Sequence, residues 1–67
     1  MDIHIKDEYI KLGQLLKLAG LADSGVEAKE YILAGEVKVN GETDLRRGRK
    51  CVPGDEISFR GKSIKVS

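Results

Sequence analysis

The 67-residue sequence is poor in the residues on which most metal sites and disulfide frameworks depend. It contains one cysteine (Cys51), one histidine (His4), one proline and no tryptophan. A lone cysteine cannot close an internal disulfide, and together with one histidine it cannot complete a structural zinc site. A small chain without disulfides is typical of a reducing compartment. We therefore expect a cytoplasmic protein that holds neither a metal nor another cofactor.

Long apolar runs are also missing. The start of the chain, MDIHIKDEYIK, is charged and alternating, and it lacks the apolar core of a secretory signal. No run approaches the roughly 18 apolar residues that a membrane span needs, so no membrane partner is expected. The length predicts one domain over residues 1–67, and so short a chain buries only about 60% of the surface that its unfolded form exposes. A thin core leaves little room for a deep pocket, which favours a binding surface over an enzyme.

The net charge of the chain is only +1, but the charges are unevenly distributed. Residues 1–37 carry four cations and seven acids, a net of −3, whereas residues 38–67 carry eight cations and four acids, a net of +4. The densest segment is Arg46–Lys50, RRGRK, with four cations in five positions. This asymmetry predicts a basic face. A solvated loop whose cations pair with neighbouring acids is the alternative. Those acids are Glu42, Asp44 and Asp55.

Apolar periodicity predicts two short helices in the first half of the chain. Over Leu12–Ala19 the apolar residues recur at helical spacing, and Gly20 follows where a left-handed C-terminal cap is expected. Ser24–Glu27 fits a capping box that begins a second helix, which runs to about Ala34 and is closed by Gly35. The short connection predicts that the two helices pack as a tight pair.

Strand-like alternation flanks this helix pair. It covers four segments, which are Asp2–Lys6, Val37–Val39, Asp55–Phe59 and Ser63–Val66. Turn residues separate the later segments, at Asn40-Gly41, Pro53-Gly54 and Arg60–Lys62. The order predicts an α+β domain, in which the helix pair packs on a short, mostly antiparallel four-stranded sheet.

Two segments together resemble a known family. SGVEAKEYILAGEVKVNGE (Ser24–Glu42) and VPGDEI (Val52–Ile57) are similar to the S-four RNA-binding domain. That domain occurs in a small-subunit ribosomal protein, in pseudouridine synthases, in bacterial tyrosyl-tRNA synthetases and in a heat-shock protein that binds ribosomal subunits. With LGQLLKLAGLADSG and RRGRK included, the chain looks most like the small stand-alone bacterial members. The resemblance covers about residues 9–59 and implies the α-L RNA-binding motif.

The sequence departs from the wider family at two positions. Many members begin the first helix with Arg-Leu-Asp, where this chain has Leu12–Gln14, and many place an arginine after the serine cap, where this chain has Gly25. Both cations contribute to RNA contact in larger relatives. In this chain the basic charge lies further on, at Arg46–Lys50.

The segment Arg46–Lys50, which we call the basic loop, is the first candidate for RNA contact. We expect Arg46, Arg47, Arg49 and Lys50 to form a phosphate clamp. A planar guanidinium can hold a phosphate through two hydrogen bonds, and Gly48 allows close approach of the backbone. The further candidates are Lys29, Lys38, Lys17 and Ser24. Ser24 and Lys17 each have a purely helical alternative, as a cap and as a partner of the helix dipole.

Other chemistry-bearing residues carry less weight. Cys51 is expected to be a small buried residue, and His4 a surface side chain. Tyr9, Tyr31 and Phe59 are too few for an aromatic platform on which several bases stack.

The resemblance implies a monomer that binds structured RNA without catalysing a reaction. The RNA would be ribosomal or transfer RNA, or part of a ribosomal subunit, recognised through its shape and backbone. The process would be ribosome assembly or translation. One rival is a module that docks an acidic protein surface. The other, an RNA-modifying enzyme, is disfavoured because the usual catalytic domain is absent.

Overall fold

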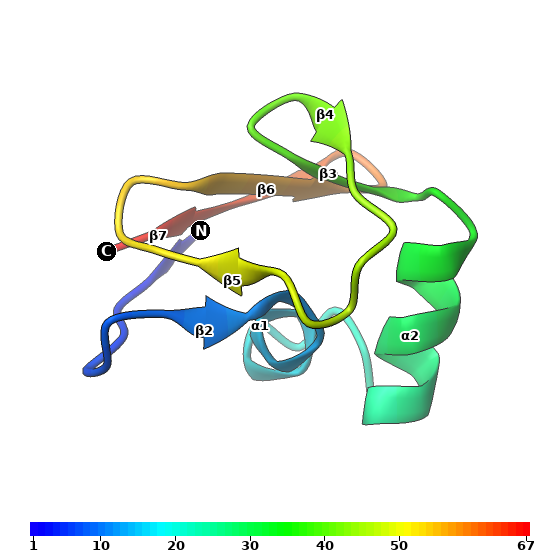
Figure 1. Cartoon of the computed structure of the whole chain (residues 1–67), viewed down its shortest axis with the longest axis horizontal. Helices are drawn as coiled ribbons and strands as arrows, with labels where there is room; N and C mark the ends of the chain where they lie inside the picture. The colour runs from blue at the N-terminus through cyan, green and yellow to red at the C-terminus, as the bar shows by residue number, and fades with distance from the viewer.

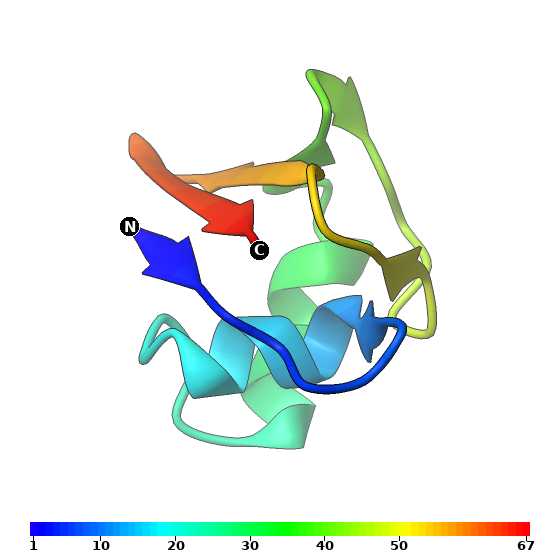
Figure 2. The same cartoon turned by 90° about the vertical axis from the view of Figure 1, so that its left-hand side faces the viewer.

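The computed structural model describes residues 1–67 and contains two helices and seven short strands (Figure 1). Both helices lie on one side of the main sheet (Figures 1 and 2). No helix is long and apolar enough to cross a membrane. The elements in chain order are β1 (Asp2–Ile3), β2 (Ile10–Lys11), α1 (Leu12–Leu18), α2 (Gly25–Leu33), β3 (Val37–Val39), β4 (Glu42–Thr43), β5 (Lys50–Cys51), β6 (Glu56–Phe59) and β7 (Lys62–Val66).

The helix boundaries follow the predicted caps. Ser24 Oγ accepts a hydrogen bond from the Glu27 N–H at 3.1 Å, as a capping box requires. The Glu27 carboxylate accepts from the N–H of Asp23 at 3.1 Å, one residue before the position expected. Gly20 and Gly35 follow α1 and α2 with φ of 76° and 78°, so both helices end at left-handed glycines as predicted.

The main sheet is mostly antiparallel, as expected, but it has five strands instead of four. Their order is β1-β7-β6-β3-β4, and only β1 and β7 run parallel. The extra strand is β4, which pairs with β3 across the tight Asn40-Gly41 turn, where φ is 53° and 85°. A separate two-stranded sheet joins β2 to β5. β1 is shorter than predicted and ends at Ile3.

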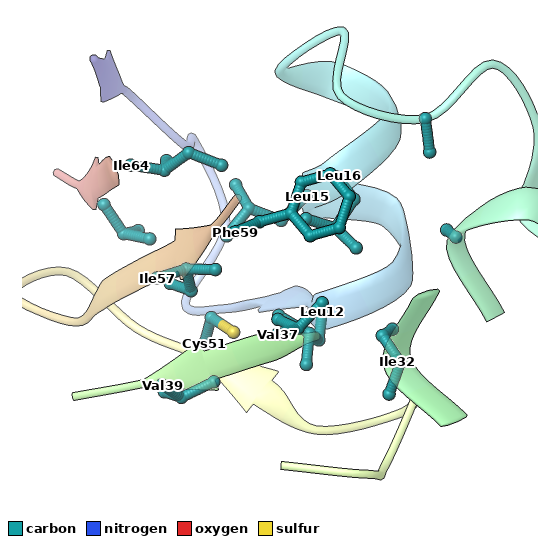
Figure 3. Close-up of a cluster of buried hydrophobic side chains, with 13 residues drawn as sticks. Leu12, Leu15, Leu16, Ile32, Val37, Val39, Cys51, Ile57, Phe59 and Ile64 are labelled. Atoms are coloured by element: carbon teal, nitrogen blue, oxygen red, sulfur yellow. The ribbon is translucent and has the colours of Figure 1, made fainter. Parts of the chain in front are cut away.

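The core lies between the helix pair and one face of the main sheet (Figure 3). From the helices it takes Leu12, Leu15, Leu16, Ala28 and Ile32, and from the main sheet Val37, Val39, Ile57, Phe59, Ile64 and Val66. Because side chains alternate along a strand, Lys38 and its cross-strand partners Ser58 and Thr43 lie on the opposite face. The sheet therefore has one face against the helices and one outer face without a covering layer.

Cys51 is fully buried in this core, which confirms the structural role expected for it. Burial raises the pKa of the Cys51 thiol to about 11. Since the thiolate is the reactive form, we expect a disulfide reagent such as DTNB to label the native protein at about pH 8 far more slowly than the protein unfolded in guanidinium. Equal labelling rates in the two states would contradict this environment.

Candidate nucleic-acid interface

A two-stranded ladder brings the start of the chain to the basic loop. In the β2–β5 pair, Lys11 lies opposite Lys50 and Ile10 lies opposite Cys51. Directly paired residues share a face, and so do residues two apart on a strand. Tyr9, Lys11 and Lys50 therefore share the solvent side of this ladder, while Ile10 and Cys51 turn inward. The Lys50 Nζ lies over the Tyr9 ring, 4.9 Å from its centroid.

The basic loop is also fastened to the start of α1. The Leu12 N–H donates to the Arg49 carbonyl at 2.8 Å, and the Gly13 N–H donates to the Arg47 carbonyl at 3.1 Å. Gly13 is buried beneath the side chain of Arg47, and a Cβ at this position would lie 2.8 Å from the Arg47 Cγ. The missing side chain at Gly13 is therefore what allows Arg47 to lie across the helix.

Around Arg47 the surface forms a hollow of about 320 Å³, which we call the basic groove. It is lined by Lys11, Gly13, Gln14, Lys17, Gly25, Arg47 and Gly48. The lining includes three cations and no acid. None of the three cations takes part in an ion pair, because the salt bridges of the protein involve other arginines. The basic groove thus carries uncompensated positive charge contributed by β2, α1 and the loop.

Two of the predicted clamp arginines are instead bound to a buried acid. Asp44, which is 7% exposed, accepts from Arg46 Nη2 at 2.8 Å, from Arg46 Nε at 3.1 Å and from Arg49 Nη1 at 2.9 Å. It also accepts from the Arg46 backbone N–H at 2.9 Å. These bonds, those of the Arg46 side chain above all, hold the pKa of Asp44 far below its ordinary value.

The phosphate-clamp interpretation and the solvated-loop interpretation of the basic loop therefore apply to different residues. Arg46 and Arg49 pair with a neighbouring acid, as the solvated-loop alternative requires, and Arg49 is only 28% exposed. Arg47 and Lys50 have no acidic partner, and both are exposed. Arg49 and Asp44 shape the loop, whereas Arg47 and Lys50 present its charge to solvent.

The remaining predicted residues fall into three positions. Lys17 lines the basic groove. Lys29 lies one turn beyond Gly25 on the same face of α2, and the Ser24 hydroxyl is engaged as the helix cap. Lys38 lies on the outer face of the sheet and does not join the other cations.

The sequence did not single out Lys11 and Gln14, which line the basic groove, and Tyr9 was considered only as part of an aromatic platform. Lys11 is in β2, and Tyr9 immediately precedes this strand. A strand of two residues has no apolar periodicity from which it could be predicted. Gln14 lies on the exposed side of α1, where its identity alone carries no signal. The available clue was the pair of cations around α1, with Lys11 immediately before the helix and Lys17 in its last turn.

Comparisons with known proteins agree with this architecture. Residues 3–67 match the S4 domain family. YbcJ of Escherichia coli (strain K12) is 43% identical over 61 residues, which cover 91% of this chain and 87% of YbcJ. A Bacillus subtilis (strain 168) protein named "Probable ribosome maturation protein RlbA" is 49% identical over 59 residues, covering 88% of this chain and 83% of RlbA.

A solved structure extends the match to three dimensions. The solution structure of E. coli YbcJ superposes with a TM-score of 0.74 at 39% identity, covering 97% of this chain and 84% of that one. That structure is described as containing an αL motif involved in RNA binding. The helix pair on a mostly antiparallel sheet is the same α-L arrangement that the sequence predicted. The chain belongs to the S4 domain family.

Proposed function

We propose that this protein binds structured RNA through the basic groove, without catalysing a reaction. The observation that carries the proposal is the convergence of Lys11, Lys17 and Arg47, all without acidic partners, on one hollow. Neutralising several phosphates releases counterions and supplies most of the affinity of such contacts. The groove offers a phosphate-binding surface of this kind.

Two glycines of the groove leave the protein backbone open to a ligand. Nothing covers the positions where Gly25 and Gly48 lack a side chain, so a phosphate can approach the backbone there, whereas Gly13 lies beneath Arg47. Gly25 is also the first residue of α2, whose free N–H groups add partial positive charge there. Contacts of this type read shape and backbone, and they are expected to discriminate poorly between sequences.

We infer that the ligand is a ribosomal or transfer RNA in the cytoplasm, and that ribosomal RNA is the first candidate. The named role of RlbA in ribosome maturation supports this choice, as does the RNA-binding motif described for YbcJ. The residues proposed here to contact phosphate differ from those of the clamp predicted from the sequence. Arg47, Lys11 and Lys17 contact phosphate in the basic groove, and Lys50 extends this surface from its position opposite Lys11. Arg46 and Arg49 hold the loop through Asp44.

The test is a titration of ribosomal RNA stem–loops with the protein over a range of salt concentrations. If Lys11, Lys17, Arg47 and Lys50 each neutralise a phosphate, the slope of log K against log[salt] should be near roughly −3. A slope near zero would contradict the proposal. Polyglutamate of similar charge is the control. Binding to it as tight as to RNA would favour an acidic protein partner instead.

A further inference from the structure

A second hollow, of about 680 Å³, adjoins the basic groove, and we call it the side groove. It lies where the chain between β1 and β2 crosses α1, a crossing visible in Figure 2. The two grooves share two lining residues, Gln14 and Lys17. Its volume is within the range of about 300 to 1,000 Å³ that small-ligand sites occupy. A ligand lying in the basic groove can therefore extend directly into the side groove.

The two grooves differ in chemistry. The basic groove has no hydrophobic lining residue, whereas the side groove is lined by Ile5, Tyr9, Ile10 and Leu18. The Tyr9 side chain is 38% exposed and Leu18 is 59% exposed, so apolar surface is open to a ligand there. Its one acid, Asp7, is outnumbered by Lys6 and Lys17. An aromatic and aliphatic wall beside a phosphate-binding surface suits a flat, uncharged group joined to a phosphate.

Polar groups in the side groove are suited to a nucleobase. No intramolecular hydrogen bond occupies the Gln14 amide, which can both donate and accept. The Lys50 ammonium lies over the Tyr9 ring in a cation–π contact. A base stacked on an aromatic ring gains affinity with little sequence preference, because every base has a π-face.

The β2–β5 ladder fixes the distance between the phosphate contact and the base contact. Tyr9 lines the side groove and Lys11 lines the basic groove, and the two are two residues apart on one face of the chain. At the rise of an extended strand this corresponds to about 6.6 Å. The sugar of one nucleotide can span such a distance, with its phosphate at Lys11 and its base at Tyr9.

We propose that the side groove holds an unpaired nucleobase of the bound RNA, stacked on Tyr9, so that the ligand is a helix with an adjacent single-stranded nucleotide. This inference rests on the proposed function and narrows its ligand. Three aromatic residues are too few for a platform on which several bases stack. A single ring beside a phosphate groove is enough for one base.

The test compares two RNAs of equal charge. Both are duplexes with a single-stranded extension of about five nucleotides, and in one of them the extension is abasic. The wild-type protein should bind the RNA with bases about tenfold more tightly, which is the size of one base–aromatic stack. Tyr9→Ala should remove this preference and bind the abasic RNA like wild type, while Tyr9→Phe should keep the preference. Circular dichroism checks that each variant is folded.

Two results would overturn the inference. Equal wild-type affinity for the two RNAs would leave RNA binding by the basic groove intact and remove the base site. A preference that survives in Tyr9→Ala would exclude stacking on this ring, and if both affinities fall by the same factor, Tyr9 only positions Lys50. If the wild-type protein binds neither RNA, the proposed function itself fails.

Discussion

Replacing Arg47 with glutamate is expected to weaken binding to structured RNA by about 10- to 100-fold. A hydrogen bond to a charged group contributes about 1.5 to 3 kcal/mol, and each 1.4 kcal/mol is a factor of ten in affinity. Arg47 is exposed and makes no ion pair, so its charge can be reversed without breaking one, and glutamate keeps the Cγ that lies over Gly13. The measurement is the dissociation constant for a ribosomal RNA stem–loop, with the melting temperature as a check on folding.

Gly13→Ala provides a second variant that leaves the charge unchanged. The new methyl group would meet the Arg47 Cγ at 2.8 Å, so the arginine side chain must shift from its place over Gly13. Gly13 is the second residue of α1, where the helix-interior preference for alanine applies only in part, so the melting temperature is again the check on folding. We expect weaker RNA binding than in wild type, by a smaller factor than for Arg47→Glu. Wild-type affinity in both variants would show that Arg47 does not contact RNA.

Asp44→Asn is expected to lower the free energy of unfolding by about 2 to 3 kcal/mol, because a buried carboxylate that accepts charged hydrogen bonds is lost. Exposed Arg46 is screened by solvent, so most of the loss comes from the half-buried Arg49 and the loop that it holds. For a domain of this size the melting temperature should fall by roughly 10 to 20 °C. Thermal unfolding at about pH 6 measures the change.

The lowered pKa of Asp44 also predicts how the stability difference between wild type and Asp44→Asn depends on pH. The folded pKa of Asp44 lies below its ordinary value of 3.8, mainly because the Arg46 side chain donates to it. A lowered folded pKa stabilises the protein above the unfolded pKa, and this contribution disappears as the pH falls through the folded pKa. The stability difference between wild type and Asp44→Asn should therefore be full at about pH 6 and should shrink below about pH 4. A difference that stays constant down to about pH 2 would contradict this role.

Local signals in the sequence accounted well for the framework of the fold. Ser24, Gly20 and Gly35 marked helix ends, and Asn40-Gly41 marked a hairpin, because cap and turn chemistry depends on only a few neighbouring residues. The number of strands could not be predicted as well from the sequence. Glu42–Thr43 pairs with β3 although neither residue is buried, so no apolar pattern marked it as a strand.

The candidate site was predicted only in part, because its geometry depends on contacts between distant segments. The sequence showed the cluster of cations at the basic loop, but it could not distinguish Arg46 and Arg49, which bind Asp44, from Arg47, which lies over Gly13. The β2–β5 ladder joins residues about 40 positions apart, and nothing local to Lys11 indicates that it meets Lys50. Pairing of this kind is a tertiary property.

The most direct test of the basic groove compares two lysine variants of identical chemistry. Lys17 lines the groove and Lys38 lies on the outer face of the sheet, and both side chains are exposed. Salt titrations with a ribosomal RNA stem–loop should give a slope about one unit shallower for Lys17→Gln than for wild type, and an unchanged slope for Lys38→Gln. Equal slopes for the two variants, or a loss confined to Lys38→Gln, would contradict the basic groove as the RNA-binding surface.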